Sequence, residues 1–417
     1  MFHSINAAAH GPLGQPMAAA VQACVHCGFC LAACPTYREL GQEMDSPRGR
    51  IVLMKQVLEG TLPAEAAEPH VDKCLGCLAC EPACPSGVQY RDLISPFRAL
   101  AEKKRLRPLM ERIRRWAVAF TLPHPARFRV AAALARIAKG FAPLIPKSFR
   151  PMLDLLPDKL PAKQTWPAVS PAIGPRRARV ALLIGCAQQV LDPDINTATI
   201  EVLTRNGVEV VIPPTQGCCG ALAWHVGDIS AARKFARQNV MAFPDDVDAI
   251  VTNAAGCGSG LHEYHLILAG TADAENAEQF RHRVCDVSLF LTRLGGLIPP
   301  PPQKTNRRIA YHDACHLANA QGVRSEPRAL LAMIPGAEIV ELPDAHMCCG
   351  SAGTYNMDQP EIAACLGAAK AAAITDSVAH SVATGNIGCI SQLRAHLHGR
   401  IPVLHTMQVL RNAYRGL

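Results

Sequence analysis

Eight cysteines near the start of the chain form two copies of one spaced run. Each run reads C-x2-C-x2-C-x3-C-P, a pattern typical of proteins that hold [4Fe–4S] clusters through thiolates. Small residues between the cysteines would let the backbone approach a cluster and point N–H groups at its sulfides. We therefore expect two clusters and one-electron redox chemistry. The runs consist of Cys24, Cys27, Cys30 and Cys34 before Pro35, and of Cys74, Cys77, Cys80 and Cys84 before Pro85.

The fourth cysteine of each run is expected to bind the cluster of the other run. In this type of run the first three thiolates wrap one cluster, and the fourth is carried away from it. The two clusters would then be linked through the protein. The predicted ligands are Cys24, Cys27, Cys30 and Cys84 for one cluster, and Cys34, Cys74, Cys77 and Cys80 for the other.

Two other uses of these cysteines are less consistent with the sequence. Pairs of C-x2-C motifs also bind zinc, but zinc sites do not need the x3-C-P extension in both runs. A disulfide framework is disfavoured because residues 1–20 lack the basic start and the unbroken apolar core of a signal peptide. We therefore expect the thiols to lie in a reducing, cytoplasmic compartment.

Eight further cysteines form a second pattern that repeats after about 130 residues. In each copy a single cysteine, an adjacent pair followed by Gly, and a final cysteine each follow a predicted strand. Because open α/β folds place ligand sites at the carboxyl ends of strands, the four thiols of a copy can converge on a metal or redox centre. The alternative is that they are small buried hydrophobes. The copies are Cys186, Cys218, Cys219 and Cys257, and Cys315, Cys348, Cys349 and Cys389.

Two histidines flank the first cysteine of the second copy. His312 lies three residues before Cys315, and His316 lies directly after it. Imidazole at these positions could bind a metal or donate to a thiolate, whereas ordinary packing or solvent exposure is the alternative. Because of these histidines, we expect the second copy to be the better candidate site and the first copy the weaker one.

The positive charge of the chain is concentrated in one segment. The 417 residues carry a formal net charge of +8, and residues 98–163 alone hold 16 Lys and Arg against four acids. This strip could attract an acidic partner or anionic lipid headgroups, or it could be a solvated helical linker. Nucleic acid is disfavoured, because no recognisable binding motif accompanies the charge. No window approaches the roughly 18 uninterrupted apolar residues that a membrane span needs.

The order of these motifs predicts a mixed α and α/β protein. Residues 1–97 should form a helical ferredoxin-type domain, because the stretch between the two runs is amphipathic at helical spacing. Residues 98–176 should form a basic helical connector. Residues 177–300 and 301–417 should form two copies of an α/β cysteine-rich domain. The strands are expected at 180–184, 208–212, 250–253, 309–312, 339–342 and 383–387.

Four segments carry a resemblance to a known family. They are CVHCGFCLAACPTY from Cys24, DSPRGRI from Asp45, LGCLACEPACPSGV from Leu75 and YHDACH from Tyr311. Together with the paired C…CCG…C units, they resemble the family of the glycolate oxidase iron–sulfur subunit. That family also includes the anaerobic glycerol-3-phosphate dehydrogenase small subunit, lactate-utilisation iron–sulfur proteins and heterodisulfide reductase subunits. The resemblance covers nearly the whole chain.

The resemblance implies an iron–sulfur electron-transfer subunit of a flavin-dependent glycolate oxidase. FAD-binding partner subunits would oxidise glycolate to glyoxylate, and this chain would relay the electrons towards the quinone pool or another membrane acceptor. It would lie in the cytoplasm or peripherally on the cytoplasmic face of the inner membrane. No Gly-rich dinucleotide fingerprint follows a predicted strand, so we expect no flavin on this chain.

Several alternatives stay open at this point. The chain could serve a related lactate or glycerol-3-phosphate dehydrogenase, act as a thiol–disulfide reductase, or be a scaffold whose clusters only hold the fold. One departure bears on the reductase: heterodisulfide reductase units end in C-x-x-C, whereas here the last positions are Gly260 and Gln392. This departure argues against a catalytic noncubane cluster of that type.

Overall fold

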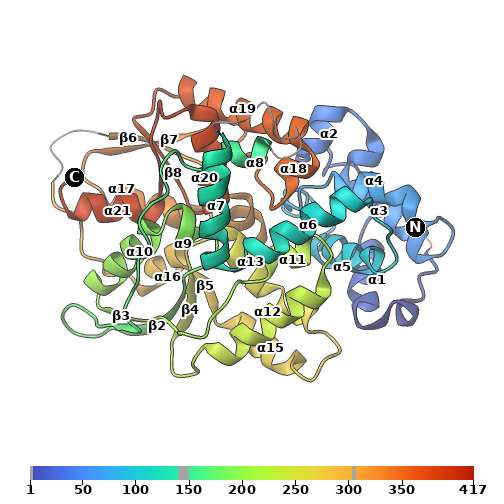
Figure 1. The fold of residues 1–417 in the computed structure, drawn as a ribbon, viewed down its shortest axis with the longest axis horizontal. Helices are drawn as coiled ribbons and strands as arrows, with labels where there is room; N and C mark the ends of the chain where they lie inside the picture. The colour runs from blue at the N-terminus through green and yellow to red at the C-terminus, as the bar shows by residue number, and fades with distance from the viewer. Residues whose placement is uncertain (1–2, 140–149, 303–306) are drawn as a thin grey trace.

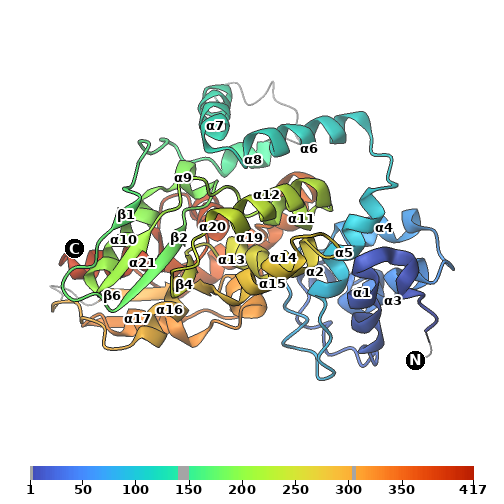
Figure 2. The ribbon, with the colours of Figure 1, turned by 90° about the horizontal axis from the view of Figure 1, so that it is seen from below.

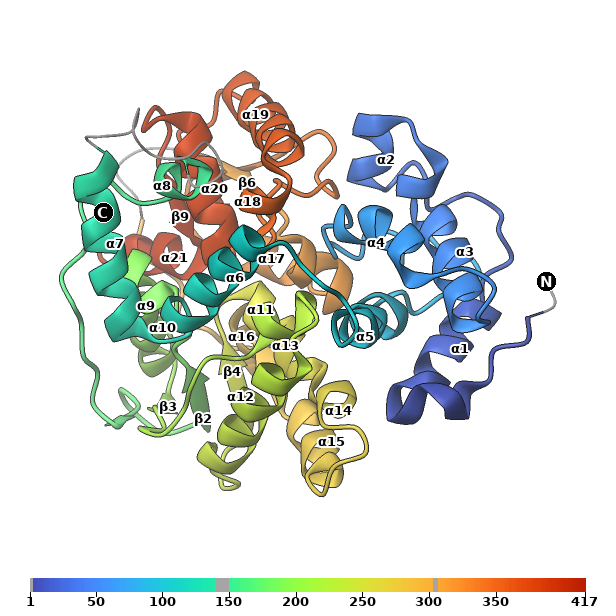
Figure 3. The same ribbon diagram turned by 45° about the vertical axis from the view of Figure 1, so that its right-hand side comes forward.

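The computed structural model describes residues 3–139, 150–302 and 307–417. Figure 1 shows a helical N-terminal part in blue beside two α/β units, with a helical connector crossing in front of them. Figure 3 shows the same N-terminal part beside the two units, and its apolar core is continuous with that of the first unit. The predicted mixed α and α/β fold is therefore confirmed, with the duplicated α/β part following the helical part.

The N-terminal part is built from helices and loops, without a strand among its described residues. A helix joins the two cysteine runs, as the amphipathic pattern predicted. The hydroxyl of Ser46 caps this helix by accepting from Gly49 N at 3.0 Å, and Pro47 occupies its first turn. The elements are η1 (Ala7–Leu13), α1 (Gly14–Gln22), α2 (Pro35–Leu40), η2 (Glu43–Asp45), α3 (Pro47–Leu58), α4 (Ala64–Asp72) and α5 (Arg91–Glu102).

Helix α5 connects the N-terminal part to the first α/β unit. Its apolar face is buried through Leu93 and Phe97. Arg98, on the following turn, donates to His225 O of the first α/β unit at 3.1 Å and to Cys74 O at 2.6 Å. The domain boundary that the sequence placed after residue 97 therefore falls inside a continuous helix.

The connector consists of three helices that lie on one edge of the molecule. They are α6 (Leu109–Thr121), α7 (Pro125–Lys139) and α8 (Arg150–Asp154). Figure 2 shows α6 and α7 along the top of the molecule, outside the two α/β units. No helix in the described ranges is long and apolar enough to cross a membrane.

The first α/β unit contains a five-stranded sheet with the order β1-β3-β2-β4-β5. All neighbouring strands are parallel except β1 and β3, which are antiparallel. The elements are β1 (Val169–Ser170), β2 (Ala178–Leu183), α9 (Gln188–Leu191), α10 (Asp194–Arg205), β3 (Val208–Val211), α11 (Ala221–His225), α12 (Ile229–Ala242), β4 (Ala249–Thr252), α13 (Ala255–His262), α14 (Tyr264–Ile267), α15 (Ala274–His282), β5 (Val284–Asp286) and α16 (Val287–Leu294).

The second unit repeats this topology with four parallel strands in the order β7-β6-β8-β9. Strands β6 to β9 correspond in sequence and position to β2 to β5, so the internal duplication inferred from the cysteines is also a duplication of the fold. The elements are β6 (Arg307–Tyr311), the π-helix η4 (His316–Ala320), α17 (Ser325–Ala332), β7 (Ala337–Glu341), α18 (Tyr355–Asp358), α19 (Pro360–Asp376), β8 (Ser381–Thr384), α20 (Ile387–Leu397), β9 (Val403–His405) and α21 (Thr406–Tyr414).

All six strands predicted from the sequence are present, with bounds shifted by one or more residues. The largest difference is at the strand expected over 383–387, which instead covers Ser381–Thr384. It ends earlier because the backbone bends at Gly385, and Asn386 is the N-cap of α20, which begins at Ile387. Strands β1, β5 and β9 were missed, because two or three residues are too few to show an alternating pattern.

The two α/β units pack against each other over a shared core. Residues from both sheets share one apolar core, in which Leu182 of β2 and Leu410 of α21 are fully buried. The loops that follow β4 and β8 also meet, because Ala255 N donates to Gly385 O at 3.0 Å. The carboxyl ends of equivalent strands in the two units therefore lie close together.

A buried carboxylate joins the segment before α3 to the segment before the second cysteine run. Asp45 is 1 % exposed. His70 Nδ1 lies 2.8 Å from its Oδ1, Lys73 Nζ donates to Oδ2 at 3.0 Å, and Arg50 lies 3.9 Å away. Burial alone would raise the pKa of Asp45, but the hydrogen bonds from His70 and Lys73 outweigh it and lower that pKa. Since Lys73 directly precedes Cys74, this network helps to position the second run.

We expect Asp45→Asn to destabilise the N-terminal part by about 3 kcal/mol, because the buried Arg50 loses its counter-charge. The folded-state pKa of Asp45 is lowered, so its stabilisation is complete above pH ~5 and is lost progressively as the pH falls through the unfolded and then the folded pKa. Thermal unfolding at several pH values should show a constant deficit above pH ~5 that shrinks in acid. Asp72→Asn, which removes a more exposed partner of Arg105, is the control. A deficit that is independent of pH throughout would contradict this role.

Candidate functional site

The two cysteine runs fold into loops with the same backbone conformation. Positive φ angles occur two and four residues after the first cysteine of each run, at His26 (56°) and Gly28 (87°), and at Gly76 (66°) and Leu78 (57°). Left-handed residues at these two positions curl the backbone tightly. The shared conformation follows from the shared spacing of the cysteines.

The first group of thiols, which we name the outer set, lies at the molecular surface. Its four members line one small cavity together with Cys80. Arg48 crosses the loop and donates to His26 O at 3.1 Å, while its other nitrogens bind Glu43. A β-carbon at Gly28 would lie 2.8 Å from this guanidinium, so the glycine makes room for it. The outer set is Cys24, Cys27, Cys30 and Cys84.

The second group, which we name the inner set, is more deeply buried. It consists of Cys34, Cys74, Cys77 and Cys80. Burial raises the pKa of the Cys77 and Cys80 thiols, and the charges of neighbouring thiols in the set raise it further. For Cys74 the charges of Arg50 and Arg98 outweigh burial and lower the thiol pKa.

Arg50 is the group that most directly offsets negative charge in the inner set. Its side chain is 1 % exposed, although arginine is almost never fully buried without partners. Nη1 donates to Cys34 Sγ at 3.8 Å, Nη2 donates to Thr36 Oγ1 at 2.9 Å, and Nε donates to His70 O at 2.7 Å. The cation therefore lies between the end of the first run and the start of the second.

The cysteines of the first α/β unit form a continuous chain of thiols. Cys186 Sγ donates to Cys218 Sγ at 3.5 Å, and Gly220 N donates to the same sulfur at 3.4 Å. The hydrogen bonds from Cys186 and Cys219 lower the pKa of Cys218 despite burial. Cys219 is in turn hydrogen-bonded to Cys257. These thiols meet because they follow β2, β3 and β4, which are neighbours in the sheet.

Gly260 stands where a second cysteine would complete a C-x-x-C ending in the first unit, and it has no room for a side chain. A β-carbon added at Gly260 would lie 2.5 Å from Cβ of Ala221. In the second unit the equivalent Gln392 is buried and donates to Ala363 O at 3.1 Å. Neither position therefore resembles a missing thiol ligand.

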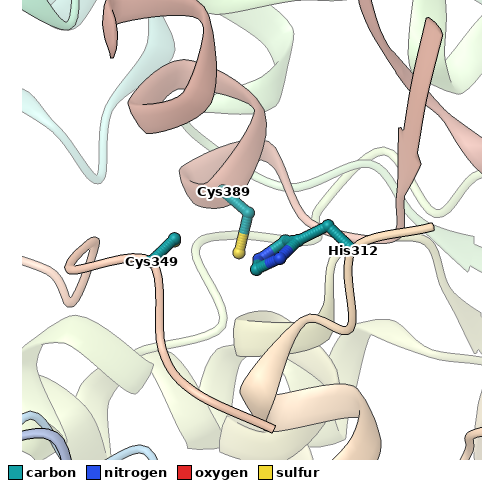
Figure 4. Close-up of side chains that lie close together, drawn as sticks. All are labelled: His312, Cys349 and Cys389. Carbon is teal, nitrogen blue, oxygen red and sulfur yellow. The ribbon is translucent and has the colours of Figure 1, made fainter. Parts of the chain in front are cut away.

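The second unit brings together an imidazole and two thiols. The ligand atoms of His312, Cys349 and Cys389 all lie within 4.8 Å of one another, and all three residues are buried. Figure 4 shows their side chains converging from a loop, a loop and the start of α20. Neither ring nitrogen of His312 is paired with an oxygen or nitrogen atom, and a hydrogen bond between His312 and Cys349 helps to lower the pKa of that thiol despite its burial. A buried imidazole beside two thiols has the donor chemistry of a metal site.

The other two cysteines of the second unit are oriented towards the inner set. Cys315 Sγ lies 4.0 Å from Cys348 Sγ. Cys348 is buried in the same apolar group as Cys77, against which Cys315 also packs. Burial is the main cause of the raised pKa of Cys77, and the charge of Cys315 is the second. The two cysteines therefore lie between the inner set and the group formed by His312, Cys349 and Cys389.

The π-helix η4 contacts the cysteine loop of the inner set through two side chains. His316 Nε2 lies 2.9 Å from Gly76 O, and Asn319 Nδ2 donates to Cys77 O at 3.1 Å. Burial, reinforced by the charge of His225, lowers the pKa of His316 to about 4, so its ring is neutral near pH 7. His316 therefore contacts the inner-set loop and does not belong to the group around His312.

A cavity of about 460 Å³ lies between the N-terminal part, the connector and the two α/β units. All four repeat cysteines of the first unit line it, whereas only Cys315 does so from the second unit. Its other walls carry arginines that are already paired, such as Arg105 with Glu68 at 2.8 Å. The sequence favoured the second unit because of its histidines, but it gave no indication that the first unit opens on a cavity.

Several residues of the site could not be recognised from spacing. Arg48, Arg50 and Asp45 all belong to the DSPRGRI segment, whose contacts became visible only in three dimensions. The one feature of the sequence that could have pointed to these residues is that Arg48 and Arg50 are charged, although they stand at the start of an otherwise apolar helix. Lys370 was also missed: it is buried on α19 and donates to Asp344 O at 2.7 Å, near Cys348 and Cys349.

Two family descriptions match the chain. The 4Fe-4S dicluster domain matches residues 20–88, which include both cysteine runs. The Cysteine-rich domain matches twice, at residues 180–262 and 309–394, once in each α/β unit.

Curated relatives match along nearly the whole length. The chain is 38 % identical to the probable glycolate oxidase iron-sulfur subunit of Bacillus subtilis, over 94 % of this chain and 93 % of the relative. It is also 38 % identical to the glycolate oxidase iron-sulfur subunit of Escherichia coli, over 94 % of each chain. One subunit of the fumarate reductase (CoM/CoB) of Methanothermobacter marburgensis is 27 % identical, over 94 % of this chain and 72 % of the relative.

Proposed function

Because the chain belongs to the family of glycolate oxidase iron–sulfur subunits, we propose that it is the electron-transfer subunit of a flavin-dependent glycolate dehydrogenase complex. FAD-binding partner subunits oxidise glycolate to glyoxylate, and this chain relays the electrons towards the quinone pool. The substrate chemistry then lies on the partners, and this chain binds no flavin itself.

The placement of the two ferredoxin-type cysteine sets is the observation that carries this proposal. The outer set reaches the surface, where Cys27 is exposed and the adjacent Val25 and Phe29 are more than 60 % exposed. The inner set packs against Cys315 and Cys348 of the second α/β unit. The chain therefore has one redox-competent set open to a partner and another set directed into the protein.

The residues present fit two iron–sulfur clusters. Each set offers four thiols, and Arg48 and Arg50 supply positive charge beside the outer and inner sets, respectively. Gly76 N also donates to Cys74 Sγ at 3.4 Å, as expected where backbone N–H groups point at cluster ligands. When bound, a [4Fe–4S] cluster supplies reversible one-electron transfer. The exchange of Cys34 and Cys84 between the two runs is part of this proposal.

A third centre in the second α/β unit is also part of the proposal. His312, Cys349 and Cys389 would bind a metal ion or a further cluster, with Cys315 and Cys348 joining them to the inner set. The first unit offers the weaker alternative: its thiols face a cavity that His225 and His316 also line, but the group of His and Cys ligand atoms within 4.8 Å of one another that the described residues contain lies in the second unit.

Glycolate-dependent reduction of the chain tests the function directly. We expect the visible iron–sulfur absorbance of the complex to bleach when glycolate is added anaerobically, and to bleach less with lactate or glycerol 3-phosphate. The isolated chain should not respond to glycolate without its flavoprotein partners. Bleaching by lactate alone would assign the chain to a lactate dehydrogenase. Reduction of a disulfide by the isolated chain would favour a thiol–disulfide reductase.

Matched serine variants test the exchange of the fourth cysteines. Anaerobically isolated protein should hold about eight irons in its two ferredoxin-type clusters, and either Cys34→Ser or Cys84→Ser should damage one cluster and leave about four. Electron paramagnetic resonance spectra of Cys34→Ser should match those of Cys74→Ser. Spectra of Cys84→Ser should match those of Cys24→Ser. The opposite pairing would show that each run holds a single cluster by itself.

Variants of the second α/β unit test the third centre. Replacing Cys348 and Cys349 by Ser, or His312 by Ala, should lower the metal content by one centre per chain, because each change removes ligands. Delivery of electrons to the final acceptor should then stop, while the flavoprotein still reduces the two ferredoxin-type clusters. Cys365→Ser, which changes an exposed thiol outside the group, is the control. Unchanged metal content and turnover would identify these residues as packing groups.

A further inference from the structure

Helix α6 has its apolar face towards solvent. Leu109, Ile113, Trp116 and Phe120 follow one another at intervals of four, three and four residues, so they form one stripe along the helix. All four are exposed, with Leu109 at 68 % and Trp116 at 64 %. The rings of Trp116 and Phe120 stack on each other with centroids 5.2 Å apart. A surface helix normally buries such a stripe and exposes its polar side.

The opposite face of α6 is polar and holds the helix on the protein. Arg114 pairs with Asp358 and donates to Met357 O at 3.1 Å. Arg115 donates to Val226 O at 2.6 Å. The polar side of the helix is therefore used for internal contacts, whereas its apolar side stays exposed, apart from the contact of Arg127 with the Phe120 ring.

Helix α7 extends the same apolar surface. Phe128 and Ala132 are buried on its inner side, whereas Val130, Leu134 and Ile137 are each more than 60 % exposed on its outer side. Figure 2 shows both helices along one edge of the molecule, with no other labelled helix or strand of the described residues outside them. We name these outer sides, together with the exposed Leu106 and Met110, the α6/α7 face. Exposed apolar surfaces of this extent mark an interaction site.

Within residues 103–139 the exposed charges are all positive, whereas Asp154 and Asp158 of the segment beside α7 are exposed acids. The only acid between residues 103 and 139 is Glu111, which pairs with Arg107 and is not exposed. The guanidinium of Arg127 lies 4.2 Å from the centroid of the Phe120 ring. The exposed cations are Lys103, Lys104, Arg112, Arg127 and Lys139.

We propose that the α6/α7 face binds the surface of an anionic lipid bilayer. Helices that lie in the membrane interface combine an apolar side containing Trp, Phe and Leu with flanking Lys and Arg. The apolar side chains enter the boundary between headgroups and acyl chains, and the cations contact lipid phosphates. The positive charge and the position of the face at an edge of the molecule favour a lipid surface over a protein partner.

Binding through the α6/α7 face would place the proposed electron-transfer subunit at a membrane surface. The binding itself does not depend on the electron-transfer function. Glu111, Arg114 and Arg115, on the inner side of α6, line the cavity that also contains the repeat cysteines. A bilayer on the outer side would therefore lie about one helix diameter, roughly 10 Å, from that cavity. Vesicle binding requires neither substrate nor flavoprotein, so this proposal and the electron-transfer function can fail separately.

Flotation with vesicles tests the proposal on the full chain, isolated anaerobically with its iron. We expect binding to vesicles of phosphatidylethanolamine and phosphatidylglycerol, and much weaker binding to phosphatidylcholine alone. The double variant Ile113→Gln, Trp116→Gln should lower the partition coefficient by about tenfold or more. Met241→Gln is the matched control, because this side chain is 84 % exposed on α12 and does not belong to the α6/α7 face. It should leave binding unchanged.

Variants of Arg112 and Arg127, which are exposed, test the contribution of positive charge to vesicle binding. Their replacement by Glu should weaken binding several-fold, and added salt should have the same effect. Arg114 and Arg115 are unsuitable for this purpose, because both are engaged in internal contacts. The sequence placed Arg112, Arg114 and Arg115 together in one basic strip, and the structure separates the exposed Arg112 from the other two.

Tryptophan fluorescence provides a second readout that does not depend on the Gln variants. Insertion of Trp116 into lipid should shift its emission to shorter wavelength, and brominated lipid should quench it. Trp116→Phe should abolish both effects while retaining vesicle binding.

Three results would overturn the proposal. One is wild-type protein that fails to float with anionic vesicles. Another is a solution dimer that the double variant dissociates, because the face would then be an interface between copies. The third is vesicle binding that disappears once the flavoprotein partners are bound, because the face would then be covered by another subunit.

Discussion

Several cysteine thiols, which we propose bind iron–sulfur clusters as thiolates, are buried side by side, and the rest of the structure depends on how their negative charge is offset. Buried charge is unfavourable unless it is paired and hydrogen-bonded. Arg50 fulfils this role for the inner set, because its guanidinium contacts Cys34 and its charge also acts on Cys74. Asp45 in turn lies near Arg50 and binds Lys73. The two cysteine runs are therefore held together by a charge network as well as by any cluster.

Duplication explains much of the architecture, and the differences between copies indicate specialisation. The two cysteine loops share their left-handed positions, and the two α/β units share their strand order. The repeat thiols of the first unit open on a large cavity, whereas those of the second unit meet His312 and the loop of the inner set. Equivalent backbones thus place the same four cysteines in different surroundings.

The connector has two roles that use opposite sides of one helix. Arg114 and Arg115 anchor α6 on the α/β units and help to close the cavity, while Trp116 points outward. An inverted amphipathic helix of this kind is stable because ion pairs and hydrogen bonds to charged groups replace apolar packing on its inner side. The cost of leaving its apolar side in water is offset if that side is covered in use.

The sequence by itself determined the local structure. The amphipathic stretch predicted α3, and the repeat predicted two α/β units with six of the observed strands. The repeated spacing of the cysteines is matched by two loops with the same left-handed positions. Only the tertiary structure decided which groups meet. Cys315 reaches Cys77 across more than 200 residues, and α6 turns its apolar side outward because Asp358 and Val226 hold its arginines. Periodicity specifies which side chains share a face, but the partner of that face depends on residues distant in sequence.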